Sequence, residues 1–162
     1  MSIVTYNNRS IANISAIPGA AKSLTHIKTL TASSSSTLSF VDGSDDVVLD
    51  STYPIYMFKY IGIHPATDGA QFQVGFRDGD TNYDATKTST FFKSQNREDG
   101  NGGSIGYETS HDLAQGTGFQ NLTQDIGNDN DQNLSGYLHL FNPASTTFVK
   151  HFIAKSNSSA SN

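Results

Sequence analysis

The sequence predicts an all-β fold, a two-sheet antiparallel sandwich of the jelly-roll type with an extended N-terminal arm. Apolar and polar residues alternate in short stretches, which is the period-two pattern of a half-buried strand. No stretch keeps the 3.6-residue period of an amphipathic helix. Ten Phe and seven Tyr are enough aromatic side chains to build a core. The clearest alternating stretches are residues 55–63, 71–77, 134–141 and 146–155.

The predicted domain organisation has three parts. Residues 1–22 form an extended arm with isolated isoleucines, which are more apolar than a solvated tail needs. Residues 23–155 form the β domain, and residues 156–162 form a polar flexible tail. We expect the arm to bind a neighbouring protein through Ile3, Ile11, Ile14 and Ile17.

The strand predicted at residues 55–63 has apolar side chains on both faces, as in the central strand of a sandwich. Alternation places Ile55, Met57, Ile61 and Ile63 on one face and aromatic residues on the other. We therefore expect both faces to be covered. The predicted core residues are Phe58, Phe72, Val74, Phe76, Leu138, Leu140, Phe148 and Phe152.

Shorter elements complete the predicted domain. The turn at residues 142–145 predicts a hairpin between the last two strands. The polar segments 42–50 and 94–104 are predicted to be exposed loops, and 94–104 to be mobile. Weaker strands are predicted at residues 24–31, 37–41, 83–92 and 118–126.

Composition excludes several classes of function. A chain of 162 residues fits one domain. It has no cysteine, so neither a disulfide nor a thiolate metal site can hold it together. The net charge is −5 and the ten Lys and Arg are scattered, which disfavours binding to nucleic acid. No segment approaches the roughly 20 apolar residues that span a bilayer, so we expect no membrane partner.

The best metal candidate alternates oxygen-bearing side chains in the manner of a calcium-binding loop: Asp78, Asp80, Asn82 and Asp84. Such a loop requires a glycine at its sixth position and a glutamate at its twelfth. Here the sixth position is not glycine and the twelfth is Ser89. An ordinary Asp-Gly turn accounts for the motif better. We expect no metal and no other cofactor.

Catalytic patterns are weak. The five histidines show no local spacing of metal ligands. Ser110, His111 and Asp112 are adjacent, but adjacency in sequence is not the geometry of a catalytic triad. We therefore expect no enzyme; a polysaccharide depolymerase with paired carboxylates is the most distant of the functions considered. Exposed tyrosines could instead stack on sugar rings, and the candidates are Tyr53, Tyr83 and Tyr107.

Four runs of sequence are long and distinctive: residues 50–53 (DSTY), 61–69 (IGIHPATDG), 127–132 (GNDNDQ) and 140–153 (LFNPASTTFVKHFI). Together they resemble a family of virion structural proteins of tailed phages, especially marine ones, over most of residues 1–155. Proteins of this family carry labels such as virion structural or tail-fibre protein. They continue into further strands after the last of these runs, so either this chain is a short form, or the strands that complete the sandwich are missing or come from a neighbour.

The resemblance implies a virion protein that is made in the cytoplasm of the host bacterium and assembled into particles, and it supplies no catalytic residues. Such a protein would decorate or cement the head, or form part of the tail or fibre, as a homo-oligomer such as a trimer. Its partners would be other capsid or tail proteins. The alternative is a carbohydrate-binding module of a phage fibre that recognises a receptor, with a glycan as its ligand.

Overall fold

The computed structural model describes residues 24–97 and 100–160 and shows an all-β chain. Within those residues the helical content is one 3-10 turn, η1 (Thr109–His111). The predicted arm, with Ile3, Ile11, Ile14 and Ile17, lies outside the described residues. The strands are β1 (Ile55–Ile63), β2 (Gln73–Val74), β3 (Phe92–Asn96), β4 (Gly103–Tyr107), β5 (Gln120–Asn121), β6 (Leu134–Phe141) and β7 (His151–Ser158).

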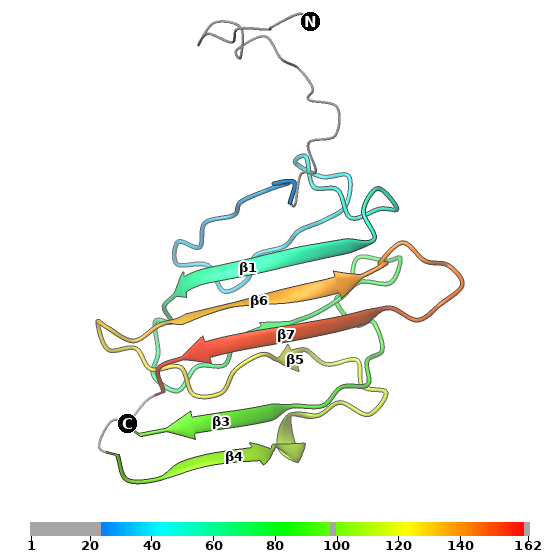
Figure 1. Cartoon of the computed structure of the whole chain (residues 1–162). Helices are drawn as coiled ribbons and strands as arrows, with labels where there is room; N and C mark the ends of the chain where they lie inside the picture. Colours follow the sequence, from blue (N-terminus) through cyan, green and yellow to red (C-terminus); the bar gives the residue numbers. More distant parts are fainter. Residues whose placement is uncertain (1–23, 98–99, 161–162) are drawn as a thin grey trace, which may run out of the picture.

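A three-stranded antiparallel sheet of order β1-β6-β7 forms the centre of the fold (Figure 1). Strand β6 pairs with β1 from Phe141↔Ile55 to Leu134↔Ile63, and with β7 from Phe141↔His151 to Leu134↔Ser158. Strands β2 and β5 form one small antiparallel pair and β3 and β4 another. The predictions for residues 55–63 and 134–141 are confirmed as β1 and β6.

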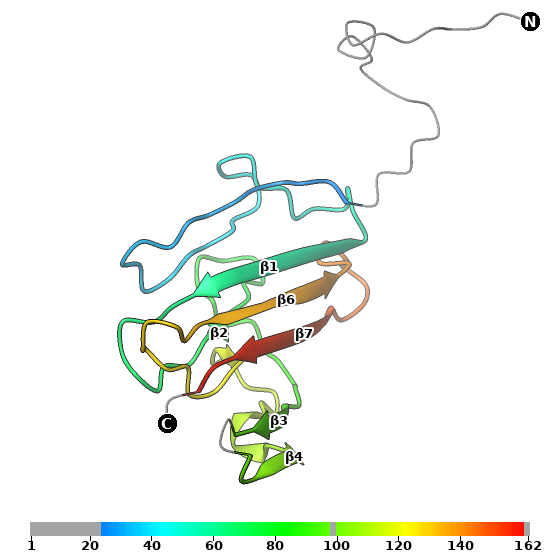
Figure 2. The same ribbon diagram turned by 60° about the vertical axis from the view of Figure 1, so that its left-hand side comes forward.

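Loops and the β2–β5 pair cover one face of the central sheet, as the two views in Figures 1 and 2 show. Aromatic rings join the sheet to this covering layer, with centroids between 4.9 and 5.4 Å apart. Such tilted and edge-on pairs stabilise a core beyond the area that they bury. The pairs are Phe40 with Phe58, Tyr60 with Phe72, and Phe76 with Phe152.

The buried core lies on this covered face. Leu138 and Leu140 are buried as predicted, but Phe148 is 73% exposed, so the prediction for Phe148 is wrong. The other predicted core residues are half-buried. The buried hydrophobic residues among those described are Val47, Tyr56, Tyr60, Ile126, Leu134, Leu138 and Leu140.

A β-bulge near the end of β1 changes the predicted arrangement of its side chains. The register shifts between Tyr60 and Ile63, and Gly62 takes the left-handed conformation with φ of 62°. A bulge adds a residue to one strand and so changes which face the following side chains occupy. Ile63 therefore packs against the core with Tyr60, whereas the alternation predicted it on the face of Ile55 and Met57.

Strand β7 begins later than the strand predicted at residues 146–155. The hydroxyl of Ser145 accepts hydrogen bonds from the backbone amides of Thr147 (3.3 Å) and Phe148 (2.9 Å). A side chain that binds nearby amides competes with strand pairing. The connection from β6 to β7 is therefore a long loop and not the four-residue turn predicted at 142–145, and β7 extends to Ser158, into the segment predicted as a flexible tail.

The segment predicted as a mobile loop at residues 94–104 contributes to a hairpin instead. Strands β3 and β4 pair in register from Phe92↔Tyr107 to Asn96↔Gly103. Their side chains are mostly polar, so the period-two pattern of a half-buried strand is missing from the sequence.

Several weaker predictions are corrected as well. Residues 24–31, 37–41 and 83–92 are irregular apart from an isolated bridge at Lys87 and the first residue of β3. The strands predicted at 71–77 and 118–126 shrink to the two-residue β2 and β5. Apolar alternation alone does not make a strand when no long partner strand lies beside it.

Candidate interaction surface

The central sheet has a second face that the described residues leave uncovered, which we call the open face. Successive side chains of a strand point to opposite sides of the sheet, and the strand register sets the neighbours on each side. Ile55 is 51% exposed and Ile153 is 62% exposed. The prediction that both faces of residues 55–63 are covered is therefore wrong. The open face consists of Ile55, Met57, Lys59, Tyr137, His139, Phe141, His151, Ile153 and Lys155.

Three aromatic side chains line up along β6 in the middle of the open face. The ring of His139 lies 5.1 Å from that of Tyr137 and 6.2 Å from that of Phe141, centroid to centroid. These rings are flanked by Met57 of β1 and Ile153 of β7, which pair with His139. The rings are held in a row by the backbone ladder, so the surface that they present is preorganised.

The two ends of the open face differ in chemistry. At one end Phe141 lies between Ile55 and His151. At the other end Tyr137 lies between two basic residues, Lys59 and Lys155. The three strands contain no Asp or Glu at all, although the chain carries a net charge of −5. The open face is therefore an apolar and aromatic surface with one basic end.

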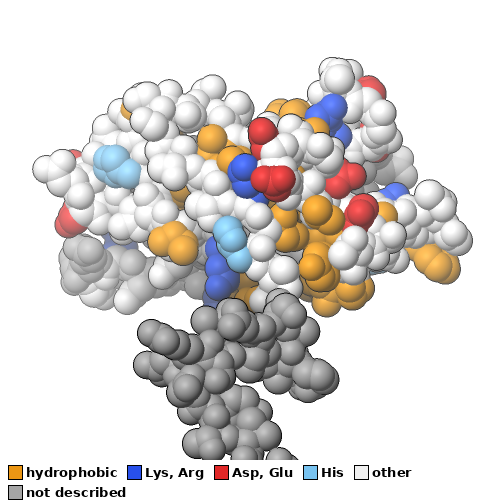
Figure 3. All heavy atoms as spheres, turned by 90° about the horizontal axis from the view of Figure 1, so that it is seen from above, with side chains coloured by type: hydrophobic (Ala, Val, Ile, Leu, Met, Phe, Trp, Pro, Cys, Tyr) orange, Lys and Arg blue, Asp and Glu red, His pale blue; other side chains and the backbone are white. Residues whose placement is uncertain are grey.

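A second apolar surface lies on the hairpin of β3 and β4, and we call it the hairpin patch. It consists of Phe92, Ile105 and Tyr107, of which Phe92 is 71% exposed and Ile105 is 86% exposed. The rings of Phe92 and Tyr107 face each other across the two strands at 5.3 Å. A further group of hydrophobic side chains, with Lys, Arg, Asp and Glu side chains beside it, lies on the surface seen from above, at the end of the molecule opposite the hairpin (Figure 3). Contiguous apolar surface of this kind marks interaction sites in soluble proteins.

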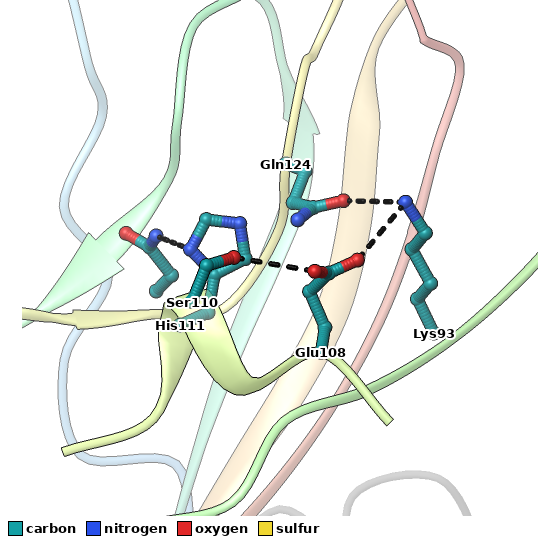
Figure 4. A network of polar contacts seen from close by, with 6 residues as sticks. Lys93, Glu108, Ser110, His111 and Gln124 are labelled. Carbon is teal, nitrogen blue, oxygen red and sulfur yellow. Dashed lines mark hydrogen bonds and ion pairs between the residues drawn. The ribbon is translucent and has the colours of Figure 1, made fainter. Parts of the chain in front are cut away.

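A polar network attaches the hairpin to the rest of the fold (Figure 4). Nζ of Lys93, on β3, lies 3.3 Å from a carboxylate oxygen of Glu108 and donates to Oε1 of Gln124 at 3.1 Å. Ser110 donates to the other carboxylate oxygen of Glu108 at 3.2 Å. The hydrogen bonds from Lys93 and Ser110 hold the pKa of Glu108 below its usual range. The network is structural, because it joins β3 to the segments that follow β4 and β5.

The same region shows that the adjacent Ser110, His111 and Asp112 do not act together. The hydroxyl of Ser110 donates to Glu108, whereas Nδ1 of His111 is 2.7 Å from Nδ2 of Asn121. Asp112 accepts hydrogen bonds from the amide of Phe91 and the hydroxyl of Tyr107. Each of the three residues therefore contacts a different partner, and the geometry of a catalytic triad is not formed.

The acidic loop brings together three of the four predicted metal-binding residues. Carboxylate oxygens of Asp78, Asp80 and Asp84 lie within 4.8 Å of one another, and all three residues are exposed. The carboxylate of Asp80 accepts hydrogen bonds from the backbone amide of Asn82 at 2.7 Å and from its side chain at 3.2 Å. Asn82 therefore stabilises the turn by donating two hydrogen bonds to Asp80.

A buried lysine offsets part of this acidic charge. Lys87 donates from Nζ to the carbonyl oxygens of Ala85 and Thr117. Burial lowers the pKa of Lys87, whereas the charges of Asp84 and Asp78 act in the opposite direction. The acidic loop thus has a counter-charge of its own within the fold.

The three tyrosines considered for sugar binding lie in separate surroundings. Tyr53 is half-buried and packs edge-on against Tyr56 at 5.8 Å. Tyr83 is half-buried beneath the guanidinium of Arg77. Tyr107 is exposed and belongs to the hairpin patch. Among the described residues, none of the three makes a ring contact with another, so they do not form one stacking platform.

Comparisons with protein-family models, with curated proteins and with solved structures found no match to the chain. In the described part of the chain, no helix is long and apolar enough to cross a membrane. The surfaces of the fold are therefore the features that bear on function.

Sequence reasoning missed both apolar surfaces. The sequence predicts the face of residues 55–63 that carries Ile55 and Met57 to be covered, because these side chains are as apolar as core residues. One signal was present: the odd-numbered positions of β7 include His151 and Lys155, which a buried face would not tolerate without partners. The hairpin patch left no comparable signal.

Proposed function

We propose that the chain is a non-enzymatic structural protein of a tailed-phage virion, which decorates or cements the head or forms part of the tail or fibre as a homo-oligomer. The observation that carries the proposal is the open face, an apolar sheet surface that the described residues do not cover. The distinctive sequence runs that resemble phage structural proteins give the kind of assembly. The protein would be made in the host cytoplasm and reside in the virion.

The balance of exposed and buried side chains supports assembly. Among the described residues, seven hydrophobic side chains are buried, whereas 13 large hydrophobic side chains are exposed. Fully burying one such side chain contributes roughly 1.5–3 kcal/mol. Isolated exposed hydrophobic residues are ordinary, but seven of these 13 lie together on the open face and the hairpin patch. Covering these surfaces would lower the free energy of the chain in an assembly.

A single surface is not enough for a stable assembly. The open face has four apolar side chains besides Tyr137 and the histidines, and each is already partly covered. Burying the area that is still exposed gains a few kcal/mol at most, by the usual estimate of about 25 cal/mol per Å². Association costs roughly 4–15 kcal/mol in lost translational and rotational freedom. The hairpin patch or the N-terminal arm must therefore contribute to the same assembly.

Assembly would also cover the second face of the central sheet. A sheet face that is apolar is stable when another layer packs on it. The covering loops and the β2–β5 pair provide one layer, and a segment from another copy would provide the layer on the open face.

The alternative is a carbohydrate-binding module of a receptor-recognition fibre. The exposed ring pair of Phe92 and Tyr107 favours it, because exposed aromatic rings can stack on sugars. The polar network around Lys93 and Glu108 would then hold the hairpin in place beside the glycan. Loss of glycan binding in Tyr107→Ala, with an unchanged fold, would support this alternative.

The experiment that tests the proposal is the quantification of this chain in purified virions by mass spectrometry, relative to the major capsid protein. A decoration protein should be present at a near-stoichiometric ratio, and a tail or fibre component at a low fixed copy number. Absence from the particles would overturn the proposal. Release of sugars from host polysaccharide by the purified chain would contradict its non-enzymatic part.

A further inference from the structure

We propose that residues 11–17 of the N-terminal arm of a neighbouring copy cover the open face. This inference deepens the proposed function, because it rests on the chain forming a homo-oligomer. It names both sides of one contact: the isoleucines Ile11, Ile14 and Ile17 on the arm, and the apolar part of the open face around Met57 and Ile153.

The open face has the properties of a receptor for a narrow apolar segment. Its middle and one end are formed by Ile55, Met57, Phe141 and Ile153, with the ring of His139 between them. These residues belong to three paired strands, so the surface stays in place without a ligand. A segment that binds there loses its own conformational entropy, but the open face is already ordered. The entropic cost of binding is therefore limited to the segment.

The position at which the described chain begins favours the arm as the occupant. Residues 24 onward run beside β1, along one margin of the central sheet, in both views (Figures 1 and 2). Twenty-three residues precede Leu24, and an extended chain spans at most about 3.3–3.6 Å per residue, or roughly 75–83 Å in total. This reach is several times the width of a three-stranded sheet, whose strands are about 4.8 Å apart. An arm that starts beside one copy can therefore reach the open face of the next.

The composition of the arm fits this face. Ile11, Ile14 and Ile17 recur every three residues and are separated by small side chains, chiefly Ala and Ser. The arm has no Asp or Glu, and neither do the three strands of the sheet. The contact would therefore depend on apolar burial, and we expect it to persist at high salt, since salt weakens exposed ionic contacts and strengthens apolar ones.

A second copy of the open face is a poorer occupant. Two sheets that pack face to face lie about 10 Å apart and exclude water from the space between them. Lys59 and Lys155 would then be drawn into an interface whose strands offer no carboxylate, and an unpaired buried charge is costly. A narrow arm over Met57 and Ile153 leaves both ammonium groups in water.

Cysteine cross-linking tests this contact directly, because the natural chain has no cysteine. Ile14→Cys is made in a chain with an added tag, and Ile153→Cys in an untagged chain. The two full-length proteins are mixed, oxidised and separated on a non-reducing gel. The matched control is Ile105→Cys, a replacement of the same kind on the more exposed hairpin patch.

The proposal predicts a tagged–untagged heterodimer in the mixture of Ile14→Cys and Ile153→Cys. Its yield should exceed that with Ile105→Cys by roughly tenfold, because contact raises the effective concentration of the two thiols. Equal yields would overturn the proposal. A disulfide formed only within single chains of the double variant Ile14→Cys/Ile153→Cys would place the arm on its own sheet and would also overturn it.

Light scattering on the same proteins separates this inference from the proposed function. An oligomer without the cross-link would refute the contact between arm and open face and leave the homo-oligomer standing. A monomer that carries no intermolecular cross-link would refute both. Circular dichroism of each variant confirms that the β fold is intact before its result is counted.

Discussion

The hydroxyl group of Tyr60 on β1 lies 2.6 Å from Oγ of Ser156 on β7, although β1 and β7 are not neighbours in the sheet. The ring reaches β7 by passing across β6 at Gly136, the residue paired with both Tyr60 and Ser156. The same hydroxyl lies 3.3 Å from the carbonyl oxygen of Lys155. Tyr60 thus fastens all three strands on the covered face, opposite the open face.

Gly136 should be intolerant of a side chain. A Cβ atom at this position would lie 2.5 Å from Cε2 of Tyr60 and 2.3 Å from the carbonyl oxygen of Lys155. Overpacking of this kind costs about 1–3 kcal/mol or more, so Gly136→Ala should lower the free energy of unfolding by at least that range. Gly106→Ala on β4 is the control, because a Cβ atom there meets nothing within 4 Å. Chemical denaturation measures both, and equal stabilities would contradict the packing described.

Tyr60 should make the fold sensitive to alkaline pH. Burial raises the pKa of Tyr60, so the group ionises more readily in the unfolded chain, where a tyrosine has a pKa of about 10. The stabilising contribution is therefore fully present below that value and is lost as the pH rises through the raised pKa of the folded state. Tyr60→Phe should cost about 0.5–1.5 kcal/mol at neutral pH and should weaken the alkaline loss. Unfolding curves that keep the same alkaline loss of stability in Tyr60→Phe would refute the assignment. A smaller remaining loss is expected from Tyr56, because burial also raises the pKa of Tyr56.

Glu108 should link the hairpin to acid pH. Hydrogen bonds from Lys93 and Ser110 lower its pKa, so the contribution of Glu108 is present above the ordinary pKa of a glutamate and is lost as the pH falls through the lowered value. Once exchange is corrected for its intrinsic pH dependence, acid should therefore lower the protection of the amides in β3 and β4 before that of the amides in β1 and β6. Glu108→Gln should exchange faster at neutral pH and lose this acid dependence. Identical exchange in the two proteins across the pH range would show that the network does not hold the hairpin.

The acidic loop should not need a metal ion. Asp80 already serves its own turn through Asn82, and Lys87 supplies positive charge nearby. Addition of a chelator should leave the melting temperature unchanged, as should calcium at millimolar concentration. A rise of several degrees with calcium, abolished by Asp84→Asn, would establish a calcium site at Asp78, Asp80 and Asp84.

The sequence predicts the central strands well for a clear physical reason. Residues 55–60 pair continuously with β6, and residues 134–141 pair along their whole length with β7, so their alternation matches a real ladder. The bulge at Gly62 is harder to foresee, because a single glycine in a strand has several uses. It nevertheless decides that Ile63 faces the core.

The surfaces could not be predicted from the sequence in the same way. Apolar side chains give the same pattern on a face that the chain covers and on a face that it leaves exposed, so the sequence predicts that Ile55 and Met57 are covered. In the hairpin of β3 and β4 the error is the opposite one, a loop predicted where strands form. Strands that are exposed on both sides lack the alternation that would identify them. For the metal candidates, sequence spacing brought Asp78, Asp80 and Asp84 together correctly, but the role of Asn82 depended on a hydrogen bond within the turn.

The mass of the purified full-length chain in solution tests the central claim most directly. Light scattering coupled to size-exclusion chromatography, over a range of micromolar concentrations, should give a fixed multiple of 17.4 kDa, with a β-type circular dichroism spectrum. Assembly through the open face and the arm requires this result. A folded protein that elutes with the mass of one chain at every concentration would contradict it, because the apolar surfaces would then be stable in water without a partner.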